Sequence, residues 1–333
     1  MGKKFDIEEW AGSIDDDVNL IKRLRGEIRK LCRKIQNFKT TEYLLNHAVN
    51  EAIKGMKPLK PTRKPPKMKT NPVEAWLCLS DWQVGKRTAT YNSKIAVKRI
   101  HKLTEEVKRY LKNEKPRVLH IALQGDMVEG EAIFPGQPFE IDSDLWTQSL
   151  RTVPELIAHV VCELYSYVPK IKVAAVHGNH GRTGLKHSGH SRKSNWDLVS
   201  YETAKLLCDK SGLSKVSWNI STDWYVKQVV CGHGILCVHG DQIRGGSPLP
   251  LANIFKKAMG WQLNIEDWNY LSVGHHHTHA SGVLNNDLYF FLSGSPESDN
   301  DFAKEHLAQG GAPVQRLCFF DKQGLISENL LRL

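Results

Sequence analysis

The N-terminal part of the chain spaces its apolar residues three and four positions apart, which is typical of one face of a helix. Two helices are therefore expected, over residues 14–38 and 41–54. In the first helix the apolar residues occupy the a and d positions of a heptad repeat, with lysine and arginine between them: Ile21, Leu24, Ile28, Leu31, Ile35 and Phe38. Because the seam is shorter than three heptads, two alternatives stay open. Residues 18–38 either form a homodimer or pack on the rest of the chain.

A proline-rich basic segment follows at residues 57–72, "KPLKPTRKPPKMKTNP", with five prolines, six basic residues and no acid. Proline at this density interrupts helix and sheet, so the segment is expected to be a semi-rigid linker. It is either a solvated connector or a positively charged strip for a phosphate backbone. The linker would separate a helical N-terminal region, residues 1–56, from a domain of residues 73–333.

From residue 73 onward, apolar runs alternate with helical patterns. The helices are expected at 92–113, 144–167, 196–210 and 250–261. The strands are expected at 73–81, 117–126, 171–180 and 269–275, as a pair within 226–240, and as hairpins from Ser281 to the end. Buried strands separated by helices predict a layered α/β domain with parallel pairing, and the hairpins make the sheets mixed.

Composition narrows the class of protein. The 333 residues are 41% hydrophobic and 25% charged, as in a globular protein, and no apolar run approaches the ~20 residues of a membrane-spanning helix. The seven cysteines are scattered and include no C-x-x-C pair, so reduced thiols and a cytoplasmic location are expected. A net charge of +10 and a pI of about 9.1 permit a polyanionic partner.

Side chains that could bind a metal ion or transfer a proton follow directly after the expected strands in the sequence. Five segments carry them: Asp81-Trp82-Gln83, Asp126 with Glu129, Asn179-His180, His239 with Asp241, and His275-His276-His277. In open α/β sheets, ligands bind beyond the carboxyl ends of the strands, so these groups are expected to converge. Each segment alone is explained as well by an ordinary turn. All five together, without a thiolate, favour two divalent ions bridged by a carboxylate, the arrangement that hydrolyses phosphate esters.

In this order the segments "DWQ", "GDMVE", "GNHG", "VHGD" and "GHHH" resemble the signature of the calcineurin-like metallophosphoesterases, over residues 73 to about 320. The resemblance implies a four-layer αββα sandwich with two mixed sheets and a dinuclear centre of Mn²⁺ above all, or of Fe, Zn²⁺ or Mg²⁺. Within the family the chain is similar to phage-type and DNA-repair exonuclease-like members, in the cytoplasm of a bacterial or phage-infected cell. These repair nucleases suggest an ATPase partner.

The resemblance also implies a role for each residue. The first ion would be held by Asp81, Gln83, Asp126 and His277. The second ion would be held by Asp126, Asn179, His239 and His275, with Asp126 bridging. His180 would not bind metal; it would face the phosphate and assist the leaving group after attack by a hydroxide held between the ions.

The spacing of the histidines gives a local prediction. In an extended segment, residues two apart face the same side at roughly 6.6–6.8 Å, so His275 and His277 would each reach a different ion. His276 would face away, and His279 would contact substrate or a neighbour of the ligands.

Three positions depart from the family signature. Gln83 replaces a histidine, and an amide oxygen coordinates more weakly, so the first site would either be loose or favour harder ions such as Mn²⁺. Glu129 replaces an aspartate. Gly181 replaces the acid that orients the catalytic histidine, so another acid, such as Asp241 or Glu129, is expected to orient His180. Arg182 beside it either clamps a phosphate oxygen or is a surface residue.

The substrate is inferred from the loops. The segment 181–197 is basic, and Lys186, Arg192 and Lys193 are candidate contacts to a phosphodiester backbone, unless it is only a surface loop. The aromatics of 131–144 would stack on bases or fill a small core. We favour a nuclease acting on DNA. The alternatives are a phosphomonoesterase or small-nucleotide phosphodiesterase, and a nucleic-acid-binding or scaffold protein with a weakened metal site.

Overall fold

The chain divides into two units, Met1–Gly55 and Met56–Leu333, in a computed structural model that describes residues 7–67, 72–131, 133–184, 193–243, 249–297 and 312–333. The first unit contains one continuous helix, α1 (Ile7–Gly55), where the sequence predicted two. Lys39 and Thr40, between the predicted helices, are neither proline nor glycine, so they do not interrupt the helix. The apolar residues of the predicted seam whose side chains are described are about half exposed: Ile21, Leu24, Ile28 and Leu31.

The second unit includes most of the segment predicted to be a linker. The backbone N–H of Leu59 donates to Ser211 Oγ at 2.9 Å, and Arg63 Nε donates to Ser166 O at 3.0 Å. The Arg63 guanidinium also lies 4.7 Å from the centre of the Tyr167 ring. Residues 56–67 are therefore held against this unit and do not form a free connector.

The first sheet has the strand order β11-β10-β1-β2-β3-β4, and its strands β1 to β4 are parallel. Its strands are β1 (Glu74–Leu79), β2 (Val118–Leu123), β3 (Ile171–Ala175), β4 (Val216–Ile220), β10 (Val314–Asp321) and β11 (Gly324–Arg332). Strand β10 runs antiparallel to both β1 and β11, so the sheet is mixed. Every residue of β1 and β2 is buried, which explains their unbroken apolar runs.

The second sheet has the order β5-β6-β7-β9-β8 and is also mixed, with β6, β7 and β9 parallel and the two edge strands antiparallel. Its strands are β5 (Tyr225–Val230), β6 (His233–Val238), β7 (Tyr270–Val273), β8 (Ala280–Asn285) and β9 (Leu288–Leu292). The two sheets pack face to face through a buried cluster that includes Trp76, Val176, Ile235 and Phe291.

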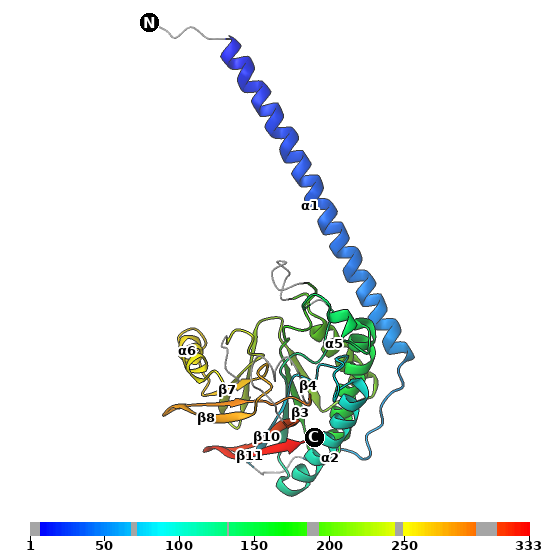
Figure 1. The fold of residues 1–333 in the computed structure, drawn as a ribbon, viewed down its shortest axis with the longest axis vertical. Helices are drawn as coiled ribbons and strands as arrows, with labels where there is room; N and C mark the ends of the chain where they lie inside the picture. The colour runs from blue at the N-terminus through cyan, green and yellow to red at the C-terminus, as the bar shows by residue number, and fades with distance from the viewer. Residues whose placement is uncertain (1–6, 68–71, 132, 185–192, 244–248, 298–311) are drawn as a thin grey trace. The chain divides into compact units, whose positions relative to one another are not determined.

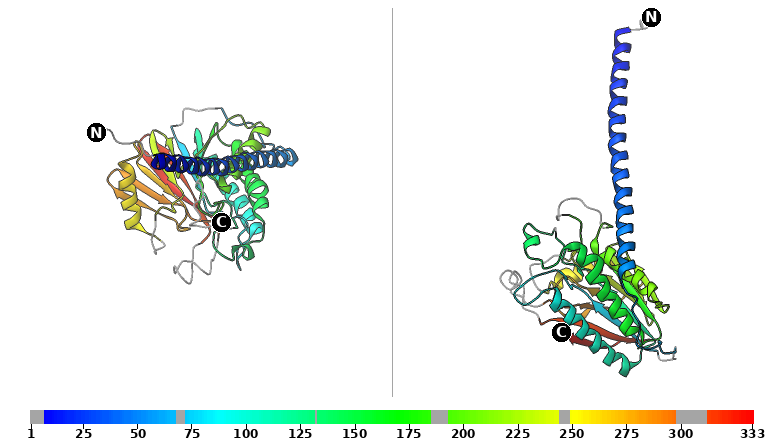
Figure 2. Two further views of the ribbon diagram at one scale, coloured as in Figure 1. Left: turned by 90° about the horizontal axis from the view of Figure 1, so that it is seen from above. Right: turned by 90° about the vertical axis from the view of Figure 1, so that its right-hand side faces the viewer.

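Helices cover both outer faces, and Figure 1 shows α2 and α5 on one side of the strands and α6 on the other. The helices are α2 (Ser93–Glu114), α3 (Leu145–Thr147), α4 (Val153–Tyr165), α5 (Trp196–Lys210) and α6 (Leu251–Gln262), with a short 3-10 helix at Gln137–Phe139 and a π turn at Gln148–Thr152. Ile254 and Ala258 of α6 pack on β6, β7 and β9. These four layers confirm the αββα sandwich with two mixed sheets. Further views are given in Figure 2.

Strand ends and one strand differ from the expectation. Strands β1, β2, β3 and β7 stop two to five residues earlier than predicted, because the chain leaves the sheet before it reaches the polar residues. Strand β4 was not predicted; its residues alternate between half-buried and exposed, as expected at the edge of a sheet.

All seven cysteines are free thiols. No helix in the described part of the chain combines the length and the apolar character needed to cross a bilayer.

At the amino end of β1, Glu74 is a buried carboxylate with three partners. It lies 2.8 Å from His120 Nε2, and it accepts hydrogen bonds from Arg117 Nε at 2.9 Å and from the Cys231 N–H at 3.1 Å. Burial alone would raise the pKa of Glu74, but the bonds from His120 and Cys231 and the nearby positive charges lower this pKa to about 2. Glu74 therefore joins β1, β2 and the β5–β6 turn at the end of the sheet opposite to the polar loops.

We predict that Glu74→Gln lowers the free energy of unfolding at pH 7 by about 2 kcal/mol, because a buried hydrogen-bonded carboxylate is removed. The folded-state pKa lies below the unfolded value of 4.5, so this stabilisation is present above pH 4.5 and is lost as the pH falls toward 2. Urea unfolding at several pH values measures the difference, with exposed Glu155→Gln as the control. A difference from wild type that does not shrink at low pH would contradict this assignment.

Candidate metal centre

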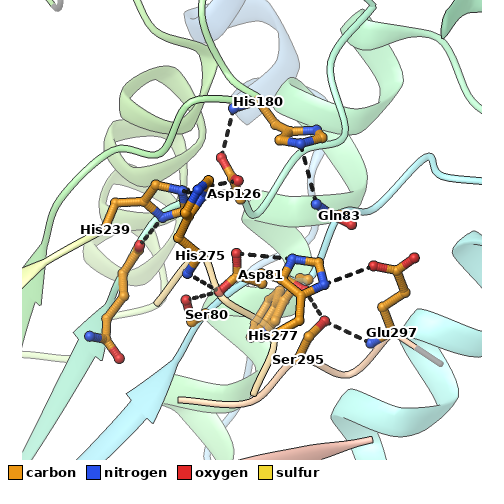
Figure 3. A network of polar contacts seen from close by, with 12 residues as sticks. Ser80, Asp81, Gln83, Asp126, His180, His239, His275, His277, Ser295 and Glu297 are labelled. Carbon is orange, nitrogen blue, oxygen red and sulfur yellow. Dashed lines mark hydrogen bonds and ion pairs between the residues drawn. The ribbon is translucent and has the colours of Figure 1, made fainter. Parts of the chain in front are cut away.

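The polar loops converge at one end of the sandwich. Strands β1, β2 and β3 are parallel neighbours, as are β6 and β7, so the carboxyl ends of each set lie at one edge of its sheet. Figure 3 shows the side chains that meet there: Ser80, Asp81, Gln83, Asp126, His180, His239, His275, His277, Ser295 and Glu297. The convergence predicted from the strand ends is therefore observed.

The backbone at these positions is strained. Among the described residues, eight that are not glycine have a left-handed φ, and five of them are predicted metal ligands: Asp81, Gln83, Asp126, His275 and His277, with φ between 41° and 65°. Such conformations cost of order 1 kcal/mol or more each and are concentrated at functional sites. His275 and His277 thus lie in a left-handed bend, and the prediction of an extended segment was wrong. The bend turns both side chains toward the centre.

One half of the centre is a tight group of four side chains. His239 Nε2 lies 3.1 Å from Asp126 Oδ2, 3.1 Å from Asn179 Oδ1 and 3.2 Å from His275 Nδ1. Among the described residues, Asp126, His239 and His275 are a group whose ligand atoms all lie within 4.8 Å of one another. Two oxygens and two imidazole nitrogens converging in this way are ligands that first-row divalent ions accept.

Hydrogen bonds around this group orient its lone pairs inward. His239 Nδ1 donates to Gln124 O at 2.8 Å, so in the neutral ring Nε2 carries a lone pair and faces the oxygens of Asp126 and Asn179. Burial would lower the pKa of His239, but the charge of Asp126 outweighs it and raises this pKa to about 10. The negative charge of Asp126 that favours a proton on this ring would also attract a metal cation to these atoms.

The other half of the centre is formed by Asp81 and His277. Asp81 is fully buried, its Oδ2 accepts from Ser80 Oγ and from the His275 N–H at 2.9 Å, and its Oδ1 accepts no hydrogen bond within the described chain. His277 Nε2 lies 3.4 Å from that orphaned oxygen, while its Nδ1 lies 3.0 Å from Glu297 Oε2. Burial opposes protonation, but Asp81 and Glu297 raise the pKa of His277 to about 10. This half therefore offers two donor atoms, Asp81 Oδ1 and His277 Nε2.

Gln83 lies beside this second pair, but its amide oxygen already has a partner. Lys86 Nζ donates to Gln83 Oε1 at 3.0 Å and pairs with Glu297 Oε1 at 2.6 Å. The Gln83 amide nitrogen lies 3.5 Å from His180 Nε2. Gln83 is therefore close to the centre, as predicted, with its oxygen directed to an ammonium group.

His180 is held by Glu129, one of the two acids expected to orient it. His180 Nδ1 lies 3.2 Å from Glu129 Oε2, and the His180 N–H donates to Asp126 Oδ1 at 2.7 Å. Burial would lower the pKa of His180, but the carboxylates of Glu129 and Asp126 raise it to about 9. Its Nε2 is thereby presented toward Gln83 and the centre.

A residue that the sequence did not single out, Asp197, fixes two of the loops. Its carboxylate accepts the backbone N–H groups of Asp126 at 2.9 Å, Met127 at 3.1 Å and Gly178 at 2.8 Å. Burial and the charge of Asp126 raise the pKa of Asp197 to about 6. Its only sequence signal is a place in the first turn of α5, after the N-cap Asn195. Lys86 and Glu297 were missed as well, since neither lies in a signature segment.

The predicted substrate contacts are distributed differently. Arg182 is half-buried; its Nη2 donates to Ile133 O at 3.2 Å, while its buried Nε has no hydrogen-bond partner within the described chain. Lys193 and His279 are exposed, and the charges that act on His279 are those of Arg316 and Arg332. His276 has a buried Nε2 that makes no hydrogen bond to the described residues. Lys186 and Arg192 lie outside the described residues.

Comparisons with known proteins identify a family. A family model described as "Calcineurin-like phosphoesterase" matches residues 76–309. Similar solved structures include a conserved uncharacterized protein of Streptococcus pneumoniae TIGR4, described as a predicted phosphoesterase (12% identity, 78% of this chain and 98% of that one, TM-score 0.32). Others are Vps29 of Chaetomium thermophilum (14%, 77% and 94%, 0.32) and 5'-nucleotidase of Candida albicans SC5314 (11%, 82% and 52%, 0.33). No curated protein sequence matches the chain.

The donor set predicts that Mn²⁺ stabilises the folded protein. At a free concentration a hundredfold above Kd, one bound ion should add about 2.7 kcal/mol to the free energy of unfolding. His239→Ala removes a ligand and should abolish this gain, whereas His101→Ala on α2 should preserve it. Urea unfolding of chelator-treated protein with and without Mn²⁺ measures the effect. Equal stabilisation of wild type and His239→Ala would show that the ion binds elsewhere.

Proposed function

The chain belongs to the calcineurin-like phosphoesterase family, and on that premise we propose that it is a nuclease that hydrolyses phosphodiester bonds of DNA. Members of this family use divalent metal ions, typically two. In this chain Asp126, Asn179, His239 and His275 would hold an ion, and Asp81 and His277 are two further donors beside Asp126. When bound, such ions acidify water and neutralise charge on phosphate oxygens.

His180 supplies the proton chemistry. His180 Nδ1 is hydrogen-bonded to the backbone oxygen of Glu129 at 3.1 Å and lies 3.2 Å from its carboxylate, so the ring is fixed and Nε2 is the nitrogen that would face a phosphoester. The neighbouring carboxylates favour the protonated ring. His180 therefore donates a hydrogen bond to a phosphate oxygen and transfers its proton to the departing oxygen.

The choice of DNA rests on the rim beside the centre, formed by residues 133–144. This segment is attached to the Gln83 loop, because the Arg87 N–H donates to Glu140 O at 2.9 Å and the Asp142 N–H to Gly85 O at 2.8 Å. Phe139 on it is 82% exposed and Phe134 39% exposed. Exposed aromatic side chains stack on unpaired bases, which fits a polynucleotide better than a small phosphoester.

Arg182 joins this rim to the centre. Its guanidinium donates to Ile133 O and is acted on by the charges of Asp126 and Asp241, while its buried Nε has no hydrogen-bond partner within the described chain. A guanidinium with free N–H groups beside a metal centre would bind a phosphate oxygen. The rim and Arg182 together support a phosphodiester flanked by bases.

The helix α1 carries an apolar seam and, away from it, a basic face. Its a positions 21 and 28 are isoleucine and its d positions 24 and 31 are leucine, the combination that favours a parallel two-stranded coiled coil. The exposed basic residues Lys22, Arg29 and Arg33 lie at b and f positions, away from that seam. We assign the seam to pairing with a second copy and the basic face to DNA phosphates.

Purified protein with Mn²⁺ should cleave single- or double-stranded DNA, and His180→Ala should reduce kcat by about 10²–10³-fold, the loss expected without an acid catalyst. The control is His101→Ala, which should retain activity. Cleavage is measured with end-labelled oligonucleotides. Turnover of p-nitrophenyl phosphate or cyclic nucleotides with DNA untouched would assign the site to small phosphoesters. DNA binding without any turnover would favour a binding or scaffold protein.

Replacing Lys22, Arg29 and Arg33 by glutamine should weaken DNA binding and make its dependence on salt shallower, by about 0.9 in log–log slope for each phosphate that the helix no longer neutralises. Glutamine keeps the helix propensity, and the seam is unchanged. Fluorescence anisotropy at several salt concentrations measures the slope, and light scattering checks that the oligomeric state is preserved. If the salt dependence of DNA binding is the same in the variant as in wild type, α1 does not contact DNA phosphates and its role is limited to pairing with a second copy.

A further inference from the structure

The two halves of the centre differ in the number of ligand atoms that remain available to a cation. On the Asp126 side there are four donor atoms. His239 Nε2 is one of them, and the other three lie 3.1–3.2 Å from it. The His239 ring is held from behind by Gln124 O, and the Gln124 side chain in turn bonds Ser272 Oγ at 2.9 Å and Ser293 Oγ at 2.6 Å. This half is a complete and rigid ligand set.

The Asp81 side offers fewer donors. Asp81 Oδ1 and His277 Nε2 are directed at each other, 3.4 Å apart. The expected third donor, Gln83 Oε1, accepts a hydrogen bond from Lys86 Nζ at 3.0 Å. Among the described residues, only the Asp126 side forms a group of three or more histidines or acidic residues with ligand atoms mutually within 4.8 Å.

Lys86 places an ammonium group at the Asp81 side. Its side chain is 12% exposed, and it pairs at 2.6 Å with Glu297, which is 3% exposed. Glu297 also lies 3.0 Å from His277 Nδ1, so Lys86 is linked to His277 through one carboxylate. Gln83 links Lys86 to the catalytic histidine, because Gln83 Oε1 accepts from Lys86 Nζ at 3.0 Å and its amide nitrogen lies 3.5 Å from His180 Nε2.

We propose that the centre retains a single divalent ion, on the Asp126–Asn179–His239–His275 side, and that Lys86 supplies the second positive charge to the bound phosphate group. A second ion at Asp81 and His277 would lack a ligand and would be repelled by the ammonium. An ammonium has three N–H groups; Gln83 accepts one of them, and Glu297 pairs with the ammonium at 2.6 Å. A third N–H, which has no partner within the described chain, would donate to a phosphate oxygen.

The inference rests on the proposed function only in naming phosphate as the ligand of Lys86. The number of retained ions is a separate property that can be measured without substrate. A protein that fails to cleave DNA would still show one ion or two, so failure of the two proposals can be told apart.

The first experiment counts ions in the full-length protein. Chelator-stripped protein is loaded with excess Mn²⁺, passed through gel filtration and analysed by elemental mass spectrometry. Wild type should retain about one Mn²⁺ per chain, and Gln83→His/Lys86→Met, which restores an imidazole and removes the charge, should retain about two. Exposed Lys98→Met should behave like wild type. Electron paramagnetic resonance should show an isolated ion in wild type and a coupled pair in the double variant.

Two results would overturn the proposal: two ions retained by wild type, or one ion retained by a double variant that melts at the wild-type temperature.

A second experiment keeps the proposal testable if the double variant does not fold. Inorganic phosphate is titrated by calorimetry into protein carrying one equivalent of Mn²⁺. Lys86→Met should bind phosphate about tenfold or more weakly, and Lys86→Arg should recover part of the loss. Equal phosphate affinity in wild type and Lys86→Met would exclude the role of Lys86.

Discussion

The carboxylate of Asp126 is the group through which the separate parts of the centre are placed. It is 1% exposed; one oxygen accepts the His180 N–H at 2.7 Å and the other faces His239 Nε2 at 3.1 Å. Its own backbone is in the left-handed region, φ 52°, which is uncommon for a residue other than glycine. Asp197 stabilises this segment, because its carboxylate accepts the N–H groups of Asp126 and of Gly178 in the neighbouring loop. A buried acid from one helix thus fixes two loops of the centre.

A buried polar network beneath the centre joins the two sheets. Gln124 follows β2 in the first sheet, and its side chain bonds Ser272 of β7 and Ser293 after β9 in the second sheet. Its carbonyl oxygen orients His239. Apolar packing between sheets specifies their approach but tolerates small shifts, whereas these hydrogen bonds require one alignment. The same residues therefore fix the sandwich and the position of a ligand.

The sequence was sufficient for the order of most elements and for the five polar segments that meet at the centre, because both follow from local pattern. Apolar runs such as 73–81 and 117–126 ended in polar residues, and parallel pairing alone brings such ends together. The conformation of the histidine segment was mistaken, since period-two spacing assumes a strand, and β7 ends at Val273 before the bend at His275. The attachment of residues 56–67 depends on contacts with Ser166, Tyr167 and Ser211 that no local pattern reveals. Asp197 and Glu297 act on residues that are distant in the sequence, so only the fold shows their partners.

Loops from both sheets place their ligands around a cation beside Asp126. Anomalous diffraction at the manganese edge, from crystals grown with Mn²⁺, tests this arrangement. We expect a strong anomalous peak bounded by Asp126 Oδ2, Asn179 Oδ1, His239 Nε2 and His275 Nδ1. Protein that folds and diffracts but shows no peak among these four atoms would contradict it.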